Sequence, residues 1–305
     1  MGLQTGALWQ FYFFWLVLPV LGLGLWPASW VRASAAWFTQ RLGFAIGVVN
    51  LGIGLGAAAL PIIVSEIAER WGWRTSYIAL GVSALLITWP IAWRWVHEPH
   101  AVSGSTRSDT SWEGDRFREA RQQRVFWALA LAFVLLGFLS GAVLVNHVNI
   151  LVERGIARET AISLQALLGA AMVVARIGTG WLLDRVHVTI VMPVFAAGAA
   201  LGFALYAGGA TGGLAVLCAV LMGLVVGAEL DVLGYAVRRY HGRRAFGSLY
   251  GLLFAAFALG SAIGTAGIGF LHSRNGSYDA GLIILALVSL AAALILTRLG
   301  RYRFT

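Results

Sequence analysis

Lysine is absent from this chain, and charged residues of any kind are scarce. All 22 basic residues are arginines, 13 residues are acidic, and the charged types together make up 11% of the 305 residues. A soluble domain carries roughly 25% charged residues. The scarcity of charge therefore excludes a protein whose whole surface meets water.

Cysteine is limited to Cys218 in an apolar run, so no disulfide can form within the chain. The histidines show no metal-binding spacing, and the sequence contains no Ser/His/Asp or cofactor motif, so it indicates neither an enzyme nor a cofactor. The net charge of +9 does not indicate nucleic-acid binding, because the arginines lie in short segments between apolar runs. The N-terminal MGLQTGALWQFYFF lacks a basic region and a cleavage site and is not expected to be a signal peptide.

Apolar residues supply 59% of the chain, and the mean hydropathy is +0.80. Whole helix-length segments are almost free of charge, as membrane-spanning helices are. The sequence predicts an all-α polytopic membrane protein with about nine spans, each near or above the ~20 residues that a bilayer needs. The predicted spans are 9–35, 42–66, 75–97, 125–151, 161–183, 188–207, 212–237, 246–271 and 279–299.

The one long polar segment, residues 98–124, is predicted to be a cytoplasmic loop. This choice puts 15 arginines on its side of the membrane and five on the other. The five are Arg70, Arg74, Arg154, Arg158 and Arg274, while Arg32 and Arg176 fall inside spans. The bias predicts a multi-pass protein of the cell's inner (plasma) membrane with a cytoplasmic C-terminus.

Four pairs of glycines repeat along the chain at a constant offset of 204 residues. The pairs are Gly43 with Gly247, Gly47 with Gly251, Gly56 with Gly260 and Gly72 with Gly276. Repeated halves are how many transporters are built. Under this offset the first three predicted helices match the last three, and the middle three have no partner. We therefore expect three further helices before Met1.

Several stretches of sequence, taken in order, resemble a known transporter family. They are WFTQRLGFAIGVVNLGIGLGAAALP (37–61), GWRTSYIALG (72–81), VNHVNILVERGIARETA (145–161), ARIGTGWLLDR (175–185) and GAELDVLGYAVRRYHGRRAFGSLYG (227–251). They resemble the major facilitator superfamily, and within it the oxalate/formate antiporter and monocarboxylate transporter branch. The resemblance implies two six-helix halves joined by a cytoplasmic loop, and on this alignment the first three helices are lacking.

The resemblance also implies a division of the chain and a function. Residues 1–97 would be the remnant of the N-terminal half with three helices, 98–124 the cytoplasmic loop, and 125–305 the six-helix C-terminal half. The expected function is secondary active transport of a small organic anion, a mono- or dicarboxylate, by alternating access, with a proton or counter-anion as the candidate coupled ion. The alternative is a non-transporting membrane remnant or sensor of the same fold.

Arg176 lies deep in a predicted span, about 10 Å or more from Asp184 at ~1.5 Å per residue. A charge at that depth costs at least ~2.5 kcal/mol and almost always faces a partner or a pathway. In the resembled monocarboxylate transporters the matching arginine binds the substrate carboxylate, and an aspartate lies four residues earlier, where this chain has Met172. Arg176 is therefore a candidate for binding substrate through its planar fork of donors. The alternative is an arginine that only locks two helices together.

Glu229 and Asp231 lie two residues apart in the apolar stretch GAELDVLGY. Their side chains are separated by about 200° around a helix, so both cannot face one cavity. Either could balance the charge of Arg176 or take up a proton, which makes both candidates for coupling. The alternative is a fixed interhelical salt bridge.

His147, Asn149 and Arg32 are further candidates for binding substrate. A neutral imidazole can donate to a carboxylate, and the amide of Asn149 can donate beside it. A histidine that only satisfies neighbouring polar groups is the alternative. Arg32 lies about 10 Å from the cytoplasmic end of its span, where it could snorkel to the surface or face inward.

Asp184 and Arg185 end the stretch GTGWLLDR. This stretch resembles the second-half copy of the superfamily's cytoplasmic gating loop. The resemblance implies that Asp184 pairs with a neighbouring helix in one conformation and releases it in the other.

Overall fold

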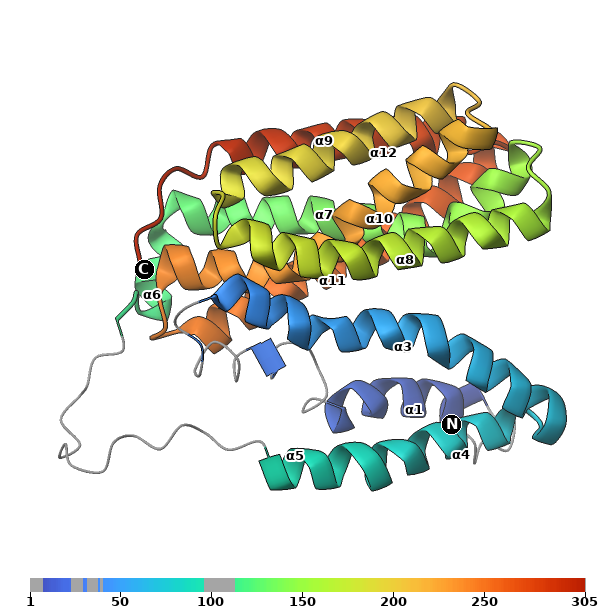
Figure 1. Cartoon of the computed structure of the whole chain (residues 1–305), viewed down its shortest axis with the longest axis horizontal. Coiled ribbons are helices and arrows are strands. Elements are labelled where there is room, and N and C mark those ends of the chain that lie inside the picture. The colour runs from blue at the N-terminus through green and yellow to red at the C-terminus, as the bar shows by residue number, and fades with distance from the viewer. Residues whose placement is uncertain (1–7, 23–29, 32–37, 39–40, 96–112, 305) are drawn as a thin grey trace.

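The computed structural model describes residues 8–22, 30–31, 38, 41–95 and 113–304, and this part of the chain is almost entirely helical (Figure 1). These residues form an all-α bundle. Its helices are α1 (Leu8–Leu21), α3 (Leu42–Trp71), α4 (Trp73–Ser83), η2 (Ala84–Thr88), α5 (Trp89–Trp95), α6 (Phe117–Gln122), α7 (Arg124–Glu153), α8 (Arg158–Leu183), α9 (Val188–Ala207), α10 (Gly212–His241), α11 (Phe246–Asn275) and α12 (Asp279–Thr297).

Six of the described helices, α7 to α12, are long and apolar enough to cross a membrane. They coincide with the last six predicted spans. The second predicted span corresponds to α3, which has 30 residues, and the third to the continuous rod of α4, η2 and α5. Of the first, 9–35, the structure describes α1 and a few later residues, so that span is tested only in part.

A π-helical turn, η2, interrupts the third rod just before Pro90. Proline has no N–H, and its ring clashes with the carbonyl four residues earlier, so a regular α-helix cannot pass through it unchanged. The wider turn lets the N–H of Trp89 bond to the carbonyl of Ala84 instead. The rod therefore continues to Trp95.

Glycines bring α7 and α11 into backbone contact. A Cβ at Gly137 or Gly141 would collide with α11 carbonyls, and a Cβ at Gly260 or Gly264 would collide with α7 carbonyls. Each pair is spaced by four residues, so both glycines lie on one helix face. In lipid, where apolar surfaces gain little from leaving the solvent, such close packing is a main source of helix association.

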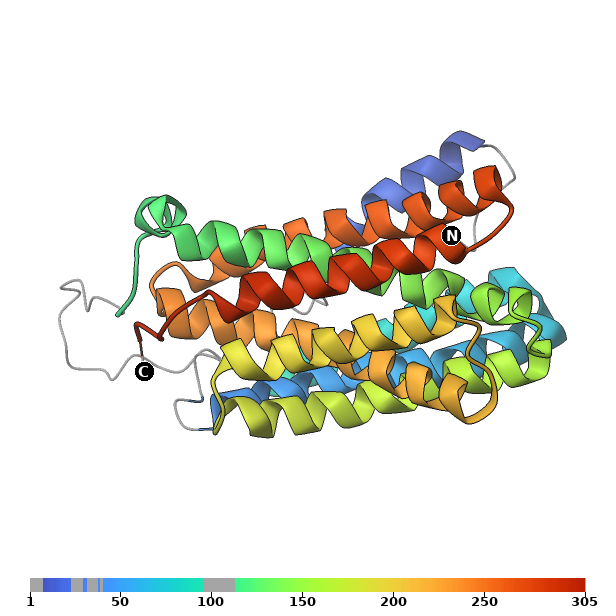
Figure 2. The same ribbon diagram turned by 90° about the horizontal axis from the view of Figure 1, so that it is seen from above.

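The helices α3 and α8 run side by side (Figures 1 and 2). Substituted Cβ atoms at Gly43 and Gly47 would lie 2.5 and 2.6 Å from the carbonyl oxygens of Gly180 and Arg176, so only glycine allows this approach. We call this contact, together with that of α3 on α10, the seam. It joins residues from opposite sides of the predicted central loop.

The repeat seen in the sequence reappears in the helix bounds. The limits of α11 equal those of α3 shifted by 204 residues at both ends. Each helix ends at a glycine with positive φ, 81° at Gly72 and 66° at Gly276. Residues with a side chain rarely adopt this backbone conformation, so glycine is needed for the stop.

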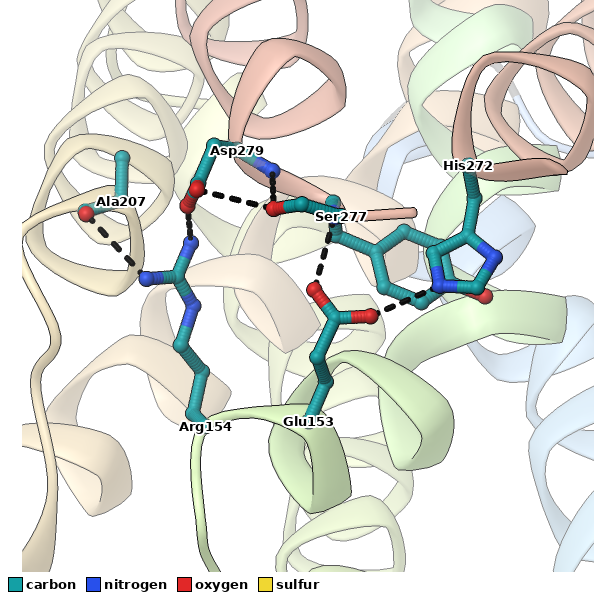
Figure 3. Close-up of polar contacts among 7 residues, drawn as sticks. Glu153, Arg154, Ala207, His272, Ser277 and Asp279 are labelled. Atoms are coloured by element: carbon teal, nitrogen blue, oxygen red, sulfur yellow. Dashed lines mark hydrogen bonds and ion pairs between the residues drawn. The ribbon is translucent and has the colours of Figure 1, made fainter. Parts of the chain in front are cut away.

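The two ends of the bundle carry different polar clusters. We call the end with Asp184, the last turn of α10 and the C-terminal tail the arginine-rich end. At the opposite end, Figure 3 shows Glu153, the last residue of α7, and Arg154, which follows it, in contact with other helices. Glu153 lies 2.7 Å from His272 Nε2 and accepts from the Tyr278 N–H at 2.8 Å, while Arg154 pairs with Asp279 and reaches the Ala207 carbonyl. These contacts fasten α7, α9, α11 and α12 into one unit.

Candidate functional site

Arg176 lies in the interior of α8, with only 2% of its surface exposed. Two glycines of α10 hold that helix against α8 beside it, since Cβ atoms at Gly223 and Gly227 would lie 2.5 Å from the carbonyl oxygens of Leu168 and Met172. Gly47 of α3 approaches the Arg176 carbonyl from the other side. The arginine is therefore placed where α3, α8 and α10 meet.

Asp231 of α10 is the acid that faces Arg176. Its Oδ1 lies 3.8 Å from Arg176 Nη1, an ion pair that is too long for a hydrogen bond. The same oxygen accepts a 2.6 Å hydrogen bond from Asn50 Nδ2 of α3. Asp231 is fully buried, so it connects all three helices without contact with solvent.

Glu229 turns to a different partner. The hydroxyl of Ser140 on α7 lies 2.6 Å from both carboxylate oxygens and can donate its one proton to either. Glu229 is 4% exposed. The two acids therefore contact different helices, as their angular separation predicts.

Several buried polar atoms around Arg176 have no hydrogen-bond partner among the described residues. They are Arg176 Nε and Nη1, Asp231 Oδ2, Thr179 Oγ1 and the Tyr250 hydroxyl. Tyr250 lies within electrostatic reach of both Asp231 and Arg176. Buried polar groups are nearly always bonded, so a cluster that keeps both donors and acceptors unused is chemically suited to a ligand. Two guanidinium N–H groups and a phenol hydroxyl suit a carboxylate.

The contacts of the other described candidates for binding substrate are with residues outside this cluster. His147 Nδ1 is 2.7 Å from Gln165 Oε1, and its Nε2 is 3.1 Å from the Tyr206 hydroxyl, so both ring nitrogens are occupied by protein groups. Asn149 is exposed and hydrogen-bonds toward Tyr278 near the opposite end. Arg32 lies outside the described residues.

Asp184 closes the seam at the arginine-rich end. Its two oxygens accept from the backbone N–H groups of Gly43 at 3.0 Å and Phe44 at 3.2 Å, in the first turn of α3. The N-cap residue of α3, Arg41, has a positive φ of 56° and gives no side-chain cap. Asp184 therefore supplies the cap from another helix, which is favourable for an acid at a helix N-terminus. Arg185 instead is exposed and lies over the Trp181 ring, 4.0 Å from its centroid.

His187 caps the start of α9 at the same end. Its Nδ1 accepts from the Thr189 N–H at 3.3 Å, and its ring stacks on Tyr302 of the tail with centroids 3.8 Å apart. Burial and the nearby charge of Arg239 hold the pKa of His187 below its ordinary value. The neutral ring is the form that can accept at Nδ1.

Four contributors to the site were not among the sequence candidates: Asn50, Ser140, Thr179 and Tyr250. A signal for Asn50 was present, because an amide in the apolar run GVVNLGIG is expensive in a bilayer unless it has a partner. Ser140 and Tyr250 carry no such signal, since isolated Ser and Tyr are common in membrane helices. Only the packing reveals them.

A family model described as Major Facilitator Superfamily matches residues 1–233. The fold agrees with a crystal structure of the major facilitator transporter FucP in the outward conformation. That match has a TM-score of 0.66 and 15% identity, and it covers 92% of this chain and 74% of that one. At this identity the likeness concerns the fold alone.

Two curated relatives extend the comparison. An uncharacterized 38 kDa protein in a 23S RNA operon of Thermoproteus tenax is 28% identical over 267 residues, which is 86% of this chain and 64% of that protein. Monocarboxylate transporter 12-B of Danio rerio is 26% identical over 196 residues, 55% of this chain and 41% of the transporter. The chain thus spans less than two thirds of the length of both relatives.

Proposed function

The chain belongs to the major facilitator superfamily, and from that premise we propose that it is a secondary active transporter of a small organic anion. The substrate would be a mono- or dicarboxylate, moved by alternating access. One observation carries the proposal: Arg176 is buried where α3, α8 and α10 meet, and two of its N–H donors are unused among the described residues. The likeness to a monocarboxylate transporter supports the same substrate class.

The role of each acid follows from its contacts. When no anion is bound, Asp231 offsets the charge of Arg176 from 3.8 Å, a distance that leaves the guanidinium free to turn to a carboxylate. Glu229 is held by Ser140 and is the candidate for a proton or charge-balancing step that does not compete with the anion. The aspartate four residues before the family's arginine is Met172 here, so Glu229 and Asp231 are our candidates for carrying a coupled proton.

We propose that Asp184 is part of a gate at the arginine-rich end. While it caps α3, the seam is closed at the arginine-rich end, which the arginine distribution predicts to be cytoplasmic. Release of the cap would let the halves part there. His147, Asn149 and Arg32 stay in the proposal as secondary candidates, whose replacement should impair uptake less than that of Arg176.

Uptake by purified protein in proteoliposomes tests the proposal. A panel of labelled mono- and dicarboxylates is compared for the wild type, Arg176→Gln and the control Arg158→Gln, an exposed arginine at the other end of α8. Arg176→Gln should lower uptake at least about tenfold, the loss expected for a hydrogen bond to a charged group, and the control should not. Uptake that survives Arg176→Gln would remove this residue from the site. A wild type that carries none of the panel would favour the alternative, a non-transporting protein of the same fold.

A further inference from the structure

Arg238 lies on the same side of α10 as Asp231. It follows Asp231 by seven residues, which places it within about 20° of the same face and about 10 Å nearer the arginine-rich end. Gly234 lies between them on this side, and a Cβ there would meet Val31 and the Ile46 side chain of α3. This face of α10 therefore looks into the seam, and Arg238 lies on the same face, nearer the arginine-rich end than Asp231.

Arg238 is buried, and part of its guanidinium is unused. It is 8% exposed, and its Nε and Nη1 have no hydrogen-bond partner among the described residues. Burying an arginine with unused donors costs free energy, and a bound anion would offset that cost.

The surroundings of Arg238 are positive. Arg239 and Arg243 are close enough to repel its charge, and Glu113 attracts it. The nearby acid Asp115 is already engaged by His241, Gln123 and Arg303. A concentration of positive charge at the mouth of a low-dielectric seam attracts small anions.

We infer that Arg238 is a second carboxylate-binding residue, on the route between Arg176 and the arginine-rich end. This inference rests on the proposed function. An anion that leaves Arg176 would be received by a second planar fork of donors, which starts about 10 Å along α10 from Asp231. Asp231 would pair with Arg176 again as the anion moves on. The carboxylate would then pass from one cationic partner to the next on its way to the arginine-rich end.

Arginine labelling with phenylglyoxal, followed by peptide mapping, tests this site by site. The purified full chain in liposomes is labelled with oxalate, inorganic phosphate or neither present, and the rates at Arg176, Arg238 and the exposed control Arg244 are compared. Oxalate should slow labelling of Arg176 and Arg238 about tenfold at saturation and leave Arg244 unchanged. The protection at Arg238 should persist in Arg176→Gln.

The outcomes separate the two proposals. Protection of Arg176 alone would overturn the second site and leave the proposed function standing. Protection at neither arginine would count against both. Loss of the Arg238 protection in Arg176→Gln would overturn the second site, because the effect would then come from a change of conformation. Phosphate protection as strong as that of oxalate would also overturn it, because Arg238 would then bind small anions in general and not carboxylates in particular.

Transport from each side gives an independent readout. Arg238→Gln should raise the KM for anion presented at the arginine-rich end about tenfold, and leave the KM from the other end within about twofold. Arg238→Lys should recover part of the loss, because it keeps the charge without the fork, and Arg244→Gln should change neither value. Equal changes in KM from both sides would contradict a site near one end.

Discussion

At the scale of single residues, the two buried acids of α10 have different partners. Asp231 is tied to Arg176 and Asn50, whereas Glu229 is tied to Ser140. A buried pair gains little over apolar packing, but removing one partner leaves the other charge without compensation. The change in the free energy of unfolding when each acid is replaced, with and without Arg176, should therefore show which acid faces the arginine.

A double-mutant cycle on the free energy of unfolding measures this. In SDS titrations of mixed micelles, Asp231→Asn and Arg176→Gln should couple by about 1–3 kcal/mol, because each change exposes the other group as an unpaired charge. Glu229→Gln with Arg176→Gln is the matched comparison and should couple less. A larger coupling for Glu229 would reverse the assignment.

His187 makes a second residue-scale prediction. Its pKa is lowered in the folded protein by burial and by Arg239, so the unfolded chain binds the proton more readily. The free energy of unfolding should therefore fall as the pH drops below about 6.5, the ordinary value for histidine. His187→Asn keeps an acceptor for the Thr189 N–H and should flatten this pH dependence between pH 7.5 and 5.5. A slope that survives the substitution would assign the titration to another group.

The sequence could predict those site residues whose side chains are costly to place in a membrane. Arg176, Glu229 and Asp231 stand out because a charge in an apolar span demands a partner. Which acid pairs with the arginine could not be predicted, since it depends on how α10 rotates against α8. Ser140 and Tyr250 were missed because a hydrogen-bonded hydroxyl costs little free energy to bury. Such residues are common in apolar helices, so the sequence does not distinguish them.

At the scale of helices, the bundle depends on glycine. The helices α7 to α12 could be predicted because an apolar run of this length crosses a bilayer as an α-helix. The glycine pairs Gly137/Gly141 and Gly260/Gly264 were present in the sequence as well, but their partners were not, because a small residue does not say which helix it meets.

Two alanine substitutions on α11 separate packing from helix propensity. A Cβ at Gly264 would collide with the Phe138 carbonyl of α7, whereas a Cβ at Gly269 meets nothing within 4 Å. Gly264→Ala should destabilise the protein by about 1–3 kcal/mol through overpacking. Gly269→Ala should be neutral or stabilising by up to about 1 kcal/mol, since alanine favours the helix. Thermal unfolding in detergent compares them, and equal effects would argue against the backbone contact.

At the scale of the whole molecule, α3 meets α8 and α10 at the seam. The ties of Glu153 and Arg154 hold α7, α9, α11 and α12 together, and none of these named contacts crosses to α3 (Figure 3). The contacts that do cross include Asp184 with the start of α3 and Asn50 with Asp231. A movement of α3 against the other helices would break these polar contacts, as the alternating access proposed above would require.

Spin labels across the seam test this movement. With labels at Arg41→Cys and Arg185→Cys, both exposed positions, Asp184→Ala should add a longer-distance component to the distribution. The matched control Glu159→Gln removes a carboxylate from the other end of α8 and should leave the distribution unchanged. The native Cys218 is buried and should not take the label. Identical distributions for Asp184→Ala and the control would show that the cap does not hold the seam.

The borrowed cap of α3 has one more consequence. Because Arg41 offers no side-chain acceptor, the amides of Gly43 and Phe44 are held by Asp184 alone among the described side chains. Each parting of the halves would return these two amides to solvent, and each closure would shield them again. Their hydrogen–deuterium exchange would therefore count openings at this end of the molecule, whether or not any solute is carried.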